Sequence, residues 1–359
     1  FKLMRRNRIT SNTRRYQKRL PDNAFIQEII YLFALVILGL NLSLYLEIQK
    51  NVSSSFPAAT SKEASANKTI ANKTIIEKEI SNLPSFYGTS AKILGENTCA
   101  AYRAAIPKHL RRWAPAGMFN CGTNTLMNLL RANCIIDRNG RNGLWQAPWG
   151  KHNPLSWRGK HWSPQFMHPR WRPRIETIFP IMVIKDPLTW MKSMCRNHYE
   201  AFFKRLPAHR DTASCPSPVN FTRTLMKYQP TIHSEYPSLV DFWQQWNFEY
   251  WNTTLPHLII RFEDLLFDSQ PTISRICFCL GGYMRDQFRQ AEEPTKSIRE
   301  GHRGPINDRS KALRLYSSEV ERYSKYSSHD LRFISDVLQN TPLLRDFNYH
   351  FSIDYSSSL

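Results

Sequence analysis

The chain has 359 residues, 42% of them hydrophobic, with ten Trp and fifteen Tyr, so it can form one large folded domain or two ordinary ones. This composition excludes a wholly disordered chain, and a formal net charge of +20 favours an anionic partner such as nucleic acid, acidic lipid, a phosphate-bearing cofactor or a sulfated glycan. Residues 1–24 hold eight Lys or Arg and one Asp, a net +7, so the remainder carries +13.

An apolar run follows this basic tail. Residues 29–46 are eighteen residues without a formal charge, close to the roughly 20 that span a bilayer, and the run extends backwards to residue 25. It ends in Leu-Tyr-Leu-Glu rather than in small residues, which disfavours a signal peptide. The basic residues before it predict a cytoplasmic N-terminus. We therefore expect a cytoplasmic tail over 1–24 and a transmembrane anchor over 25–46, with a buried core helix as the alternative.

A flexible lumenal stem is expected over 47–108. Residues 51–83 are rich in Ser, Ala, Thr, Asn and Lys and poor in aromatic residues. Glycosylation sequons begin at Asn51, Asn67 and Asn72, and later at Asn220 and Asn252. Their clustering in the stem agrees with a lumenal, glycosylated chain, although a merely polar linker is the alternative.

The seven cysteines are scattered and form no CxxC pair, which disfavours a zinc site. In an oxidising lumen some of them are expected to form disulfide bonds. Cys195 with Cys215 is the first candidate pair, because these two residues bracket one loop-rich segment. The odd count leaves at least one free thiol or an intermolecular bond.

Residues 116–130 outline a turn that leads into a helix, where free backbone N–H groups can hold a phosphate. Gly117 and Gly122 lie five positions apart, and apolar residues then recur at helical spacing. The pattern nearly matches the P-loop GxxxxGK[ST], but Thr123 stands where the lysine belongs. An ordinary glycine turn before a helix is the alternative.

Strand, loop and helix patterns alternate over residues 109–359, where we expect a folded domain. Short apolar runs at 178–184 and 258–262 predict buried strands. Helices are expected over 189–203, from Leu265 behind the capping residues Glu263 and Asp264, around 272–280 and around 330–338. Residues 143–174, with five Trp and several Pro, predict a long loop over a cleft. This alternation predicts an α/β fold with a mostly parallel sheet flanked by helices.

Three stretches, in this order, resemble the sulfotransferases that use 3′-phosphoadenosine 5′-phosphosulfate (PAPS). Residues 119–124 resemble the family's 5′-phosphosulfate loop, residues 185–193 resemble its 3′-phosphate strand–loop–helix, and residues 299–304 keep the Arg-x-Gly-x-x-Gly spacing of its C-terminal cofactor loop. The resemblance spans about 190 residues and implies a P-loop-like α/β fold. The predicted anchor and stem further resemble those of the Golgi carbohydrate sulfotransferases. The sequence Trp-Met-Lys-Ser-Met-Cys at 190–195 resembles the branch seen in algae and some marine invertebrates.

The resemblance implies PAPS as co-substrate, no metal, and a carbohydrate hydroxyl as acceptor. Anionic glycans are among the acceptors that it includes. It implies a single-pass type II protein of the Golgi membrane with the sulfotransferase-like domain, 109–359, in the lumen. The implied cofactor-binding residues are Asn120, Cys121, Gly122, Thr123, Asn124 and Thr125 for the 5′ end, Lys185 and Ser193 for the 3′-phosphate, and Arg299 and Gly301 on the far side. In the loop 120–125, backbone N–H groups and hydroxyl groups can donate hydrogen bonds to phosphate oxygens.

Two positions depart from the family pattern. Asn120 replaces the lysine that neutralises the leaving-group oxygen, and Lys185 replaces an arginine. We expect a substitute at Lys151 and His152, the first as a cation and the second, with an unperturbed pKa of about 6.5, as a base for the acceptor hydroxyl. An ordinary surface-loop contact is the alternative for both residues.

Other functions remain open from the sequence. A relative that binds PAPS or an acidic glycan without transfer is consistent with Asn120 at the lysine position. A kinase-like P-loop enzyme is a third possibility. A nucleic-acid partner is not expected, because the basic residues are dispersed and the domain is expected in a lumen.

Overall fold

The fold is built around β4 (Ile178–Ile184), a strand whose seven residues are all buried. β2 (Arg112–Ala116) and β8 (Leu258–Arg261) pair with β4 on its two sides, both in parallel, and β1 (Ile93–Leu94) pairs antiparallel with β8. A continuous apolar strand such as β4 is typical of a parallel sheet covered on both faces. The computed structural model describes residues 82–136, 143–197, 199, 201–205, 222–229, 232–290 and 309–351.

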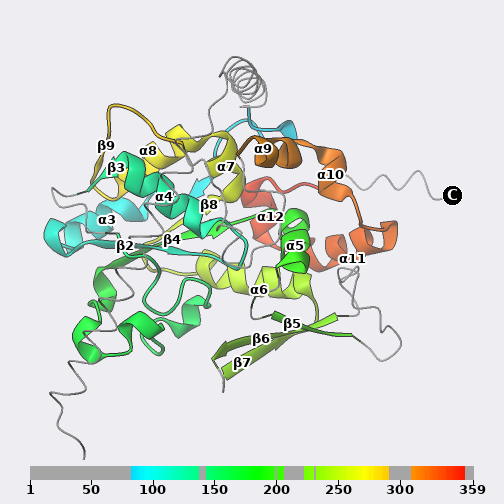
Figure 1. The fold of residues 1–359 in the computed structure, drawn as a ribbon, viewed down its shortest axis with the longest axis horizontal. Coiled ribbons are helices and arrows are strands. Elements are labelled where there is room, and N and C mark those ends of the chain that lie inside the picture. Colours follow the sequence, from blue (N-terminus) through cyan, green and yellow to red (C-terminus); the bar gives the residue numbers. More distant parts are fainter. Residues whose placement is uncertain are drawn as a thin grey trace, which may run out of the picture. The chain divides into compact units, whose positions relative to one another are not determined.

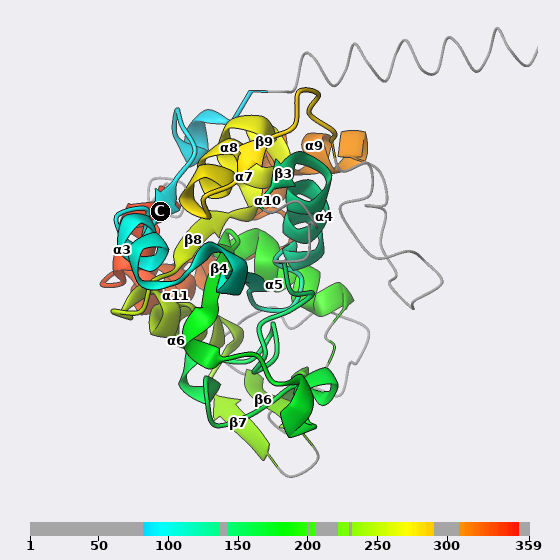
Figure 2. The ribbon, with the colours of Figure 1, turned by 90° about the vertical axis from the view of Figure 1, so that its left-hand side faces the viewer.

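Helices cover both faces of this sheet. Figures 1 and 2 show α4, α7 and α8 on one side and α6 on the other. The helices of the described residues are α3 (Thr98–Ala105), α4 (Thr123–Asn133), α5 (Pro187–Arg196), α6 (Leu239–Trp251), α7 (Phe262–Phe267), α8 (Ser269–Cys279), α9 (Arg309–Ser317), α10 (Glu319–Tyr323), α11 (Ser328–Leu338) and α12 (Pro342–Phe347). The expected α/β fold with a parallel sheet flanked by helices is confirmed.

The described residues also form two smaller antiparallel sheets. One pairs β3 (Cys134–Ile135) with β9 (Tyr283–Met284). The other has the order β5-β6-β7 and packs against α6; its strands are β5 (Ala201–Arg205), β6 (Thr222–Gln229) and β7 (Ile232–Tyr236). The helix predicted over 189–203 is therefore wrong in its second half. Pairing of β5 with β6 overrides the local helical periodicity there.

The start of α7 also differs from the prediction. The helix begins at Phe262 rather than at Leu265, so Glu263 and Asp264 lie in its first turn, and no side chain caps its N-terminus. Asp264 instead accepts a hydrogen bond from Arg261 Nε at 2.9 Å, with both side chains fully buried. The two acidic residues thus hold the core together around β8 and do not act as a helix cap.

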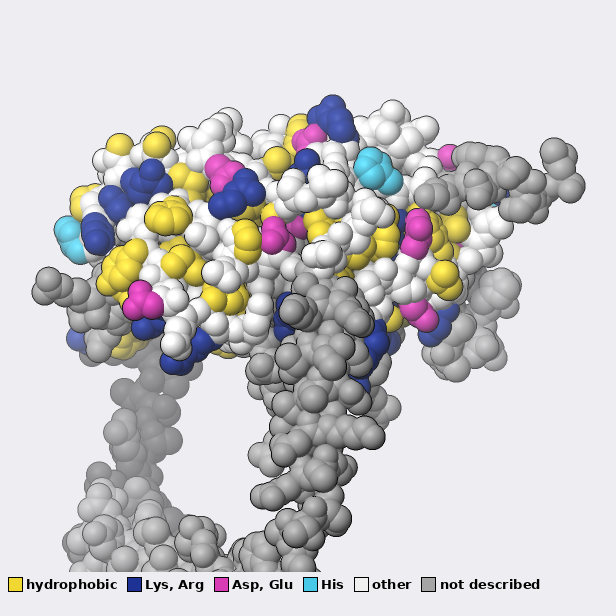
Figure 3. Space-filling view, turned by 90° about the horizontal axis from the view of Figure 1, so that it is seen from above, with side chains coloured by type: hydrophobic (Ala, Val, Ile, Leu, Met, Phe, Trp, Pro, Cys, Tyr) yellow, Lys and Arg dark blue, Asp and Glu magenta, His cyan; other side chains and the backbone are white. Residues whose placement is uncertain are grey.

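Charged side chains of both signs are interspersed with hydrophobic side chains on the face that Figure 3 shows from above. Within the described part of the chain, no helix is both long enough and apolar enough to cross a membrane. The predicted anchor at 25–46 lies outside the described residues, as do the sequons at Asn51, Asn67, Asn72 and Asn220.

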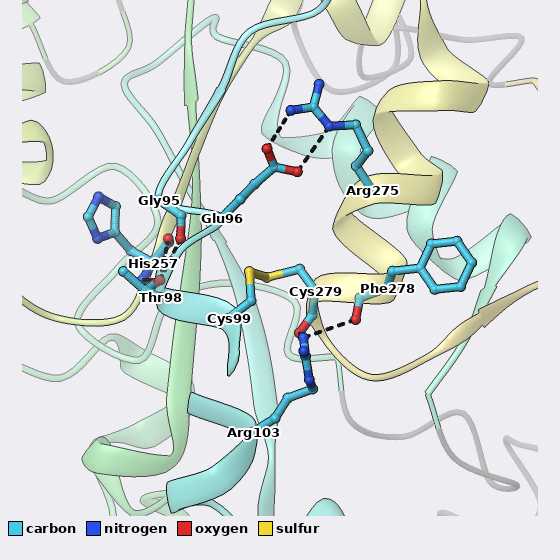
Figure 4. Close-up of a disulfide and its surroundings, with 9 residues drawn as sticks. All are labelled: Gly95, Glu96, Thr98, Cys99, Arg103, His257, Arg275, Phe278 and Cys279. Carbon is cyan, nitrogen blue, oxygen red and sulfur yellow. Dashed lines mark hydrogen bonds and ion pairs between the residues drawn. A yellow bond between two sulfur atoms is a disulfide. The ribbon is translucent and has the colours of Figure 1, made fainter. Parts of the chain in front are cut away.

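Two disulfide bonds attach α8 to distant parts of the chain. Cys279 is bonded to Cys99 on α3, and Cys277 is bonded to Cys134 in β3. Figure 4 shows the first bridge beside Arg103, whose guanidinium group donates to the Cys279 carbonyl at 2.7 Å. Disulfide bonding is thus confirmed as a property of the chain.

The N-terminal boundary of the folded domain needs correction. Residues 85–105, assigned to the stem by their position before residue 109, are part of the fold: β1 extends the central sheet and α3 is bridged to α8. Cys195 is disulfide-bonded, whereas Cys215 lies outside the described residues, so their pairing stays a prediction.

Candidate functional site

The carboxyl ends of β2 and β4 lie at one edge of the sheet, and each strand passes there through a turn into a helix. Residues 117–122 connect β2 to α4, while Lys185 and Asp186 connect β4 to α5. α5 begins at Pro187 because the Asp186 side chain accepts a hydrogen bond from the Thr189 backbone N–H at 3.0 Å. In open α/β sheets this is the edge where ligands bind.

The turn before α4 has an unusual backbone. Asn120 and Gly122 both have left-handed conformations, with φ of 61° and 83°. Asn tolerates this region better than most residues, and a Cβ at Gly122 would come within 2.4 Å of the Phe262 ring. Thr123 and Asn124 then begin α4, where the first N–H groups have no acceptor within the helix. These groups and the positive end of the helix dipole can bind an anion.

Lys185, after β4, and Ser193, on α5, are brought together by this strand–turn–helix. Lys185 Nζ donates to Ser193 Oγ at 2.9 Å, to the Tyr316 hydroxyl at 2.5 Å and to the Asn120 carbonyl at 3.4 Å. Lys185 is 2% exposed, and within the described residues its hydrogen-bond partners are all neutral oxygen atoms. Burying an ammonium group without a paired anion is costly, so an anion bound at this group would offset that cost.

Tyr316 is a site residue that the sequence does not reveal. It lies on α9, whose buried face also includes Ala312 and Leu313, so its pattern is that of an ordinary amphipathic helix. Its ring centroid lies 4.8 Å from Lys185 Nζ, and that of Phe262 lies 5.0 Å away. The ammonium group is therefore enclosed by two aromatic rings as well as by hydroxyl groups, which partly compensates its lost hydration.

The Asn120 side chain is directed at the end of α5. Its amide donates to the Asn197 carbonyl at 2.8 Å and to the Ser193 carbonyl at 3.3 Å. The last carbonyl groups of a helix have no intrahelical donor, so this amide closes the helix. The backbone carbonyl of Asn120, rather than its side chain, is the atom hydrogen-bonded to Lys185.

Lys151 reaches the first turn of α4 from the long segment after residue 143. Its Nζ donates to Asn124 Oδ1 at 2.8 Å, and its backbone carbonyl accepts from Gly117 N–H at 2.8 Å. The side chain is largely buried and lies over the Trp145 ring. The positive end of the α4 dipole and the Lys151 ammonium group repel each other. An anion bound between them would be attracted by both, so this arrangement increases the affinity of the turn for an anion.

His152 is fixed against the same turn. Its Nδ1 lies 2.8 Å from the Gly117 carbonyl, and its ring packs on Phe119 with centroids 4.4 Å apart. A carbonyl only accepts, so Nδ1 carries the proton and donates it. In the neutral ring, Nε2 is then the atom that can accept a proton. The structure thus brings Lys151 and His152 to the turn from which the sequence separates them by about 30 residues.

The other predicted residues are less informative. Cys121 is buried, belongs to no disulfide bond, and burial raises the pKa of its thiol, which makes it a packing residue. The side chains of Thr123 and Thr125 are buried in the first turn of α4. Arg299 and Gly301 lie outside the described residues.

Charged groups are packed directly behind the site. Asp186 Oδ2 accepts from Arg322 Nε at 2.8 Å, and both side chains are buried. Glu263 accepts from the Asp186 backbone N–H at 3.1 Å and from the Tyr349 hydroxyl at 2.9 Å. Burial, with a smaller contribution from the Asp186 carboxylate, raises the pKa of Glu263 to about 7. These contacts hold the turn after β4 in place and so position Lys185.

No family model, curated protein or solved structure matches this chain. The site is therefore interpreted by its own chemistry: two buried lysines, a buried serine hydroxyl, the N-terminus of α4 and a histidine of defined tautomer. This set can bind a ligand that carries two anionic groups, and it can accept a proton.

Proposed function

We propose that the chain is a sulfotransferase that transfers a sulfuryl group from PAPS to a hydroxyl of a carbohydrate. The observation that carries the proposal is the buried contact between Lys185 Nζ and Ser193 Oγ, next to the turn 117–122. It supports a phosphate site because a buried ammonium group suits a phosphate oxygen, and a bound anion would supply the missing negative charge.

The donor set fits the two anionic ends of PAPS. The N–H groups of Thr123 and Asn124, with the ammonium of Lys151, suit the 5′-phosphosulfate. Lys185 acts on the 3′-phosphate as a point charge. The Ser193 hydroxyl donates to the Thr189 carbonyl at 2.9 Å, so it would have to turn from that carbonyl to donate to the phosphate. Arg299 and Gly301 stay predictions from the resemblance, as does the P-loop-like character of the turn.

Transfer to a hydroxyl needs a proton acceptor and positive charge. PAPS supplies a sulfuryl group whose leaving group is a phosphate. The acceptor oxygen bonds to sulfur while the bond from sulfur to the phosphate oxygen breaks, and that oxygen keeps the electron pair. His152 Nε2 takes the hydroxyl proton, because Nδ1 is committed to the Gly117 carbonyl. Lys151 brings positive charge to the phosphate where negative charge develops, in place of the lysine replaced by Asn120.

The cellular setting is part of the proposal. Residues 25–46 would anchor the chain in the Golgi membrane as a single-pass type II protein, with a flexible stem after the anchor and the folded domain in the lumen. The disulfide bonds that attach α8 to α3 and β3 support an oxidising compartment. The proposed acceptor is a carbohydrate, a class that includes anionic glycans.

A second candidate is a relative that binds PAPS without transfer. It is favoured by the side chain of Asn120, which is used to close α5 and brings no charge to the turn. The two candidates share the nucleotide site and differ in whether His152 and Lys151 act on a reacting group.

Transfer of radiolabelled sulfate from PAPS to a panel of glycans tests the function, with the full chain as enzyme. We expect transfer by the wild type, and His152→Ala to lower the transfer rate at least about 100-fold while nucleotide binding persists. His109→Ala, at an exposed histidine, is the matched control and keeps the wild-type rate. Nucleotide binding without transfer to any glycan would favour the second candidate, and equal rates in both variants would remove His152 from the mechanism.

A further inference from the structure

A basic and aromatic surface lies on the segment that follows Lys151 and His152. It lies on residues 160–174, which include two short 3₁₀ helices, Pro164–Phe166 and Pro169–Trp171. We call it the Trp–Arg surface; its members are Lys160, Trp162, Arg170, Trp171, Arg172 and Arg174. Residues 160–174 contain four Lys or Arg and no Asp or Glu, and one of the four, Arg174, forms an exposed ion pair with Glu176 at 3.7 Å. In contrast, the face shown in Figure 3 mixes acidic with basic side chains.

The side chains of this surface are held in a fixed arrangement. Arg172 donates to the Phe166 and Met167 carbonyls at 3.2 and 2.9 Å, and its guanidinium group lies 4.9 Å over the Trp162 ring. Arg170 lies 6.0 Å over the ring of Trp171, which is 66% exposed. Guanidinium–aromatic pairs of this kind keep their polar edges in solvent and reduce the entropy lost when a ligand binds.

The surface is joined to the candidate site by a short path. Ser163 N–H donates to the Pro148 carbonyl at 2.7 Å, which brings the residue after Trp162 against the turn that leads to Lys151. The Lys151 carbonyl in turn accepts from Gly117 N–H. These backbone hydrogen bonds attach the segment that carries Trp162 to the segment that carries Lys151 and His152.

We propose that the Trp–Arg surface binds an anionic polysaccharide, with sugar rings against the indole faces and carboxylate or sulfate groups on the guanidinium groups. An indole offers a flat apolar face to the C–H face of a sugar ring, and a guanidinium fork matches the geometry of a carboxylate or sulfate. The inference that this surface binds the acceptor rests on the proposed function. The inference that it binds an anionic polysaccharide does not depend on that function.

Heparin, a carboxylated and sulfated polysaccharide, is the probe, with neutral dextran of matched length as the negative control, and the full chain is titrated with each. Two variants test the surface: Lys160→Ala with Arg170→Ala, and Trp171→Ala, which removes no charge. The matched control is Arg314→Ala with Arg332→Ala, two exposed residues on α9 and α11. We expect each surface variant to weaken heparin binding about tenfold and the control pair to change it less than about threefold.

Three outcomes would overturn the proposal. The first is an equal loss of heparin affinity in the double variant and the control pair, and the second is no loss of heparin affinity in Trp171→Ala. The third is that a single-stranded oligonucleotide binds as tightly as heparin and depends equally on Trp171. The first two would mean attraction by net charge alone, and the third a nucleic-acid surface. Thermal stabilisation by adenosine 3′,5′-bisphosphate, measured on the same variants, reports the nucleotide site separately. If heparin binding depends on Trp171 but the chain does not bind the nucleotide, the proposed binding surface is supported and the proposed sulfotransferase activity is contradicted.

Discussion

Lys185 Nζ lies 2.9 Å from Ser193 Oγ, eight residues further along the chain, and both side chains are buried. The spacing is produced by a strand end, a turn capped by Asp186 and two turns of α5. Their hydrogen bond is made at the sheet edge where the loops of an α/β fold bind ligands. The pair therefore places a buried positive charge at the position proposed for the 3′-phosphate.

Lys185→Met separates a binding role from a structural one. Removing a buried ammonium group that faces only neutral oxygens in the described residues should change the free energy of unfolding by less than about 1 kcal/mol, because lost hydrogen bonds and regained desolvation energy offset each other. Affinity for adenosine 3′,5′-bisphosphate should fall at least about tenfold. Urea unfolding and a nucleotide titration measure the two effects. A loss of stability above about 3 kcal/mol would mark Lys185 as structural.

Arg322→Met should behave in the opposite way. Its removal leaves the fully buried Asp186 carboxylate without its cation, at a cost of about 3–5 kcal/mol in the free energy of unfolding. Arg345→Met is the matched control: Arg345 is exposed and pairs with Asp346, so its loss should cost less than about 1 kcal/mol. Similar costs for the two variants, measured by urea unfolding, would refute the structural role of the Asp186 pair.

Stability should depend on pH through Glu263. Its pKa is raised from 4.5 to about 7, so the folded chain keeps a proton that the unfolded chain releases. This stabilisation is fully present below about pH 4.5 and is lost as pH rises through about 7. Between pH 5 and 7.5 the wild type should lose about 2 kcal/mol that Glu263→Gln does not lose.

The comparison uses urea unfolding at both pH values, and the quantity of interest is the difference between wild type and variant. Glu176→Gln, at an exposed residue, is the control and should keep the wild-type pH dependence. If Glu263→Gln also keeps it, the buried carboxyl is ionised throughout and the assignment is wrong.

The disulfide between Cys99 and Cys279 closes a loop of 180 residues. Replacing both by Ala should lower the free energy of unfolding by about 2–5 kcal/mol under oxidising conditions. Cys121→Ala removes a buried thiol outside any bridge and should cost about 1 kcal/mol. Thermal unfolding without reductant measures both, and equal losses would mean that the bridge adds nothing beyond packing.

Two substitutions at Asn120 test its left-handed backbone, because both remove the same side-chain amide. Asn120→Gly and Asn120→Ala both remove the amide that closes α5, at about 1–2 kcal/mol. Ala should cost about 1 kcal/mol more, because φ is 61° and only Gly adopts this region freely. Equal unfolding free energies for the two variants would show that the left-handed backbone is not maintained.

Part of the fold could be predicted from the sequence because its signals are local. The buried strand at 178–184 agrees with β4 residue by residue, since a central parallel strand is a continuous apolar run. The turn at 117–122 and the start of α4 follow from glycine spacing and helical periodicity. The segment 143–174 indeed holds only short 3₁₀ helices within its described residues, as its prolines predict.

The remainder depends on contacts between distant residues. Tyr316 joins Lys185 across 131 positions, and Cys99 joins Cys279 across 180, and nothing local marks either pair. The use of Asn120 to close α5 could not be predicted either, because it depends on how two turns meet in space. The positive charge of Lys151 makes it a candidate for the missing cation from the sequence alone, whereas its contact with Asn124 depends on the fold.

The most direct test of the central claim is a thermal-unfolding titration of the full chain with adenosine 3′,5′-bisphosphate, without added metal. Wild type should gain about 5 °C in Tm at about 1 mM nucleotide if the Kd is near 10 µM, a stabilisation of about 2.7 kcal/mol. Lys185→Met and Ser193→Ala should gain much less, whereas Arg314→Ala should match the wild type. No shift in the wild type, or equal shifts in Lys185→Met and wild type, would contradict a nucleotide site at this edge of the sheet.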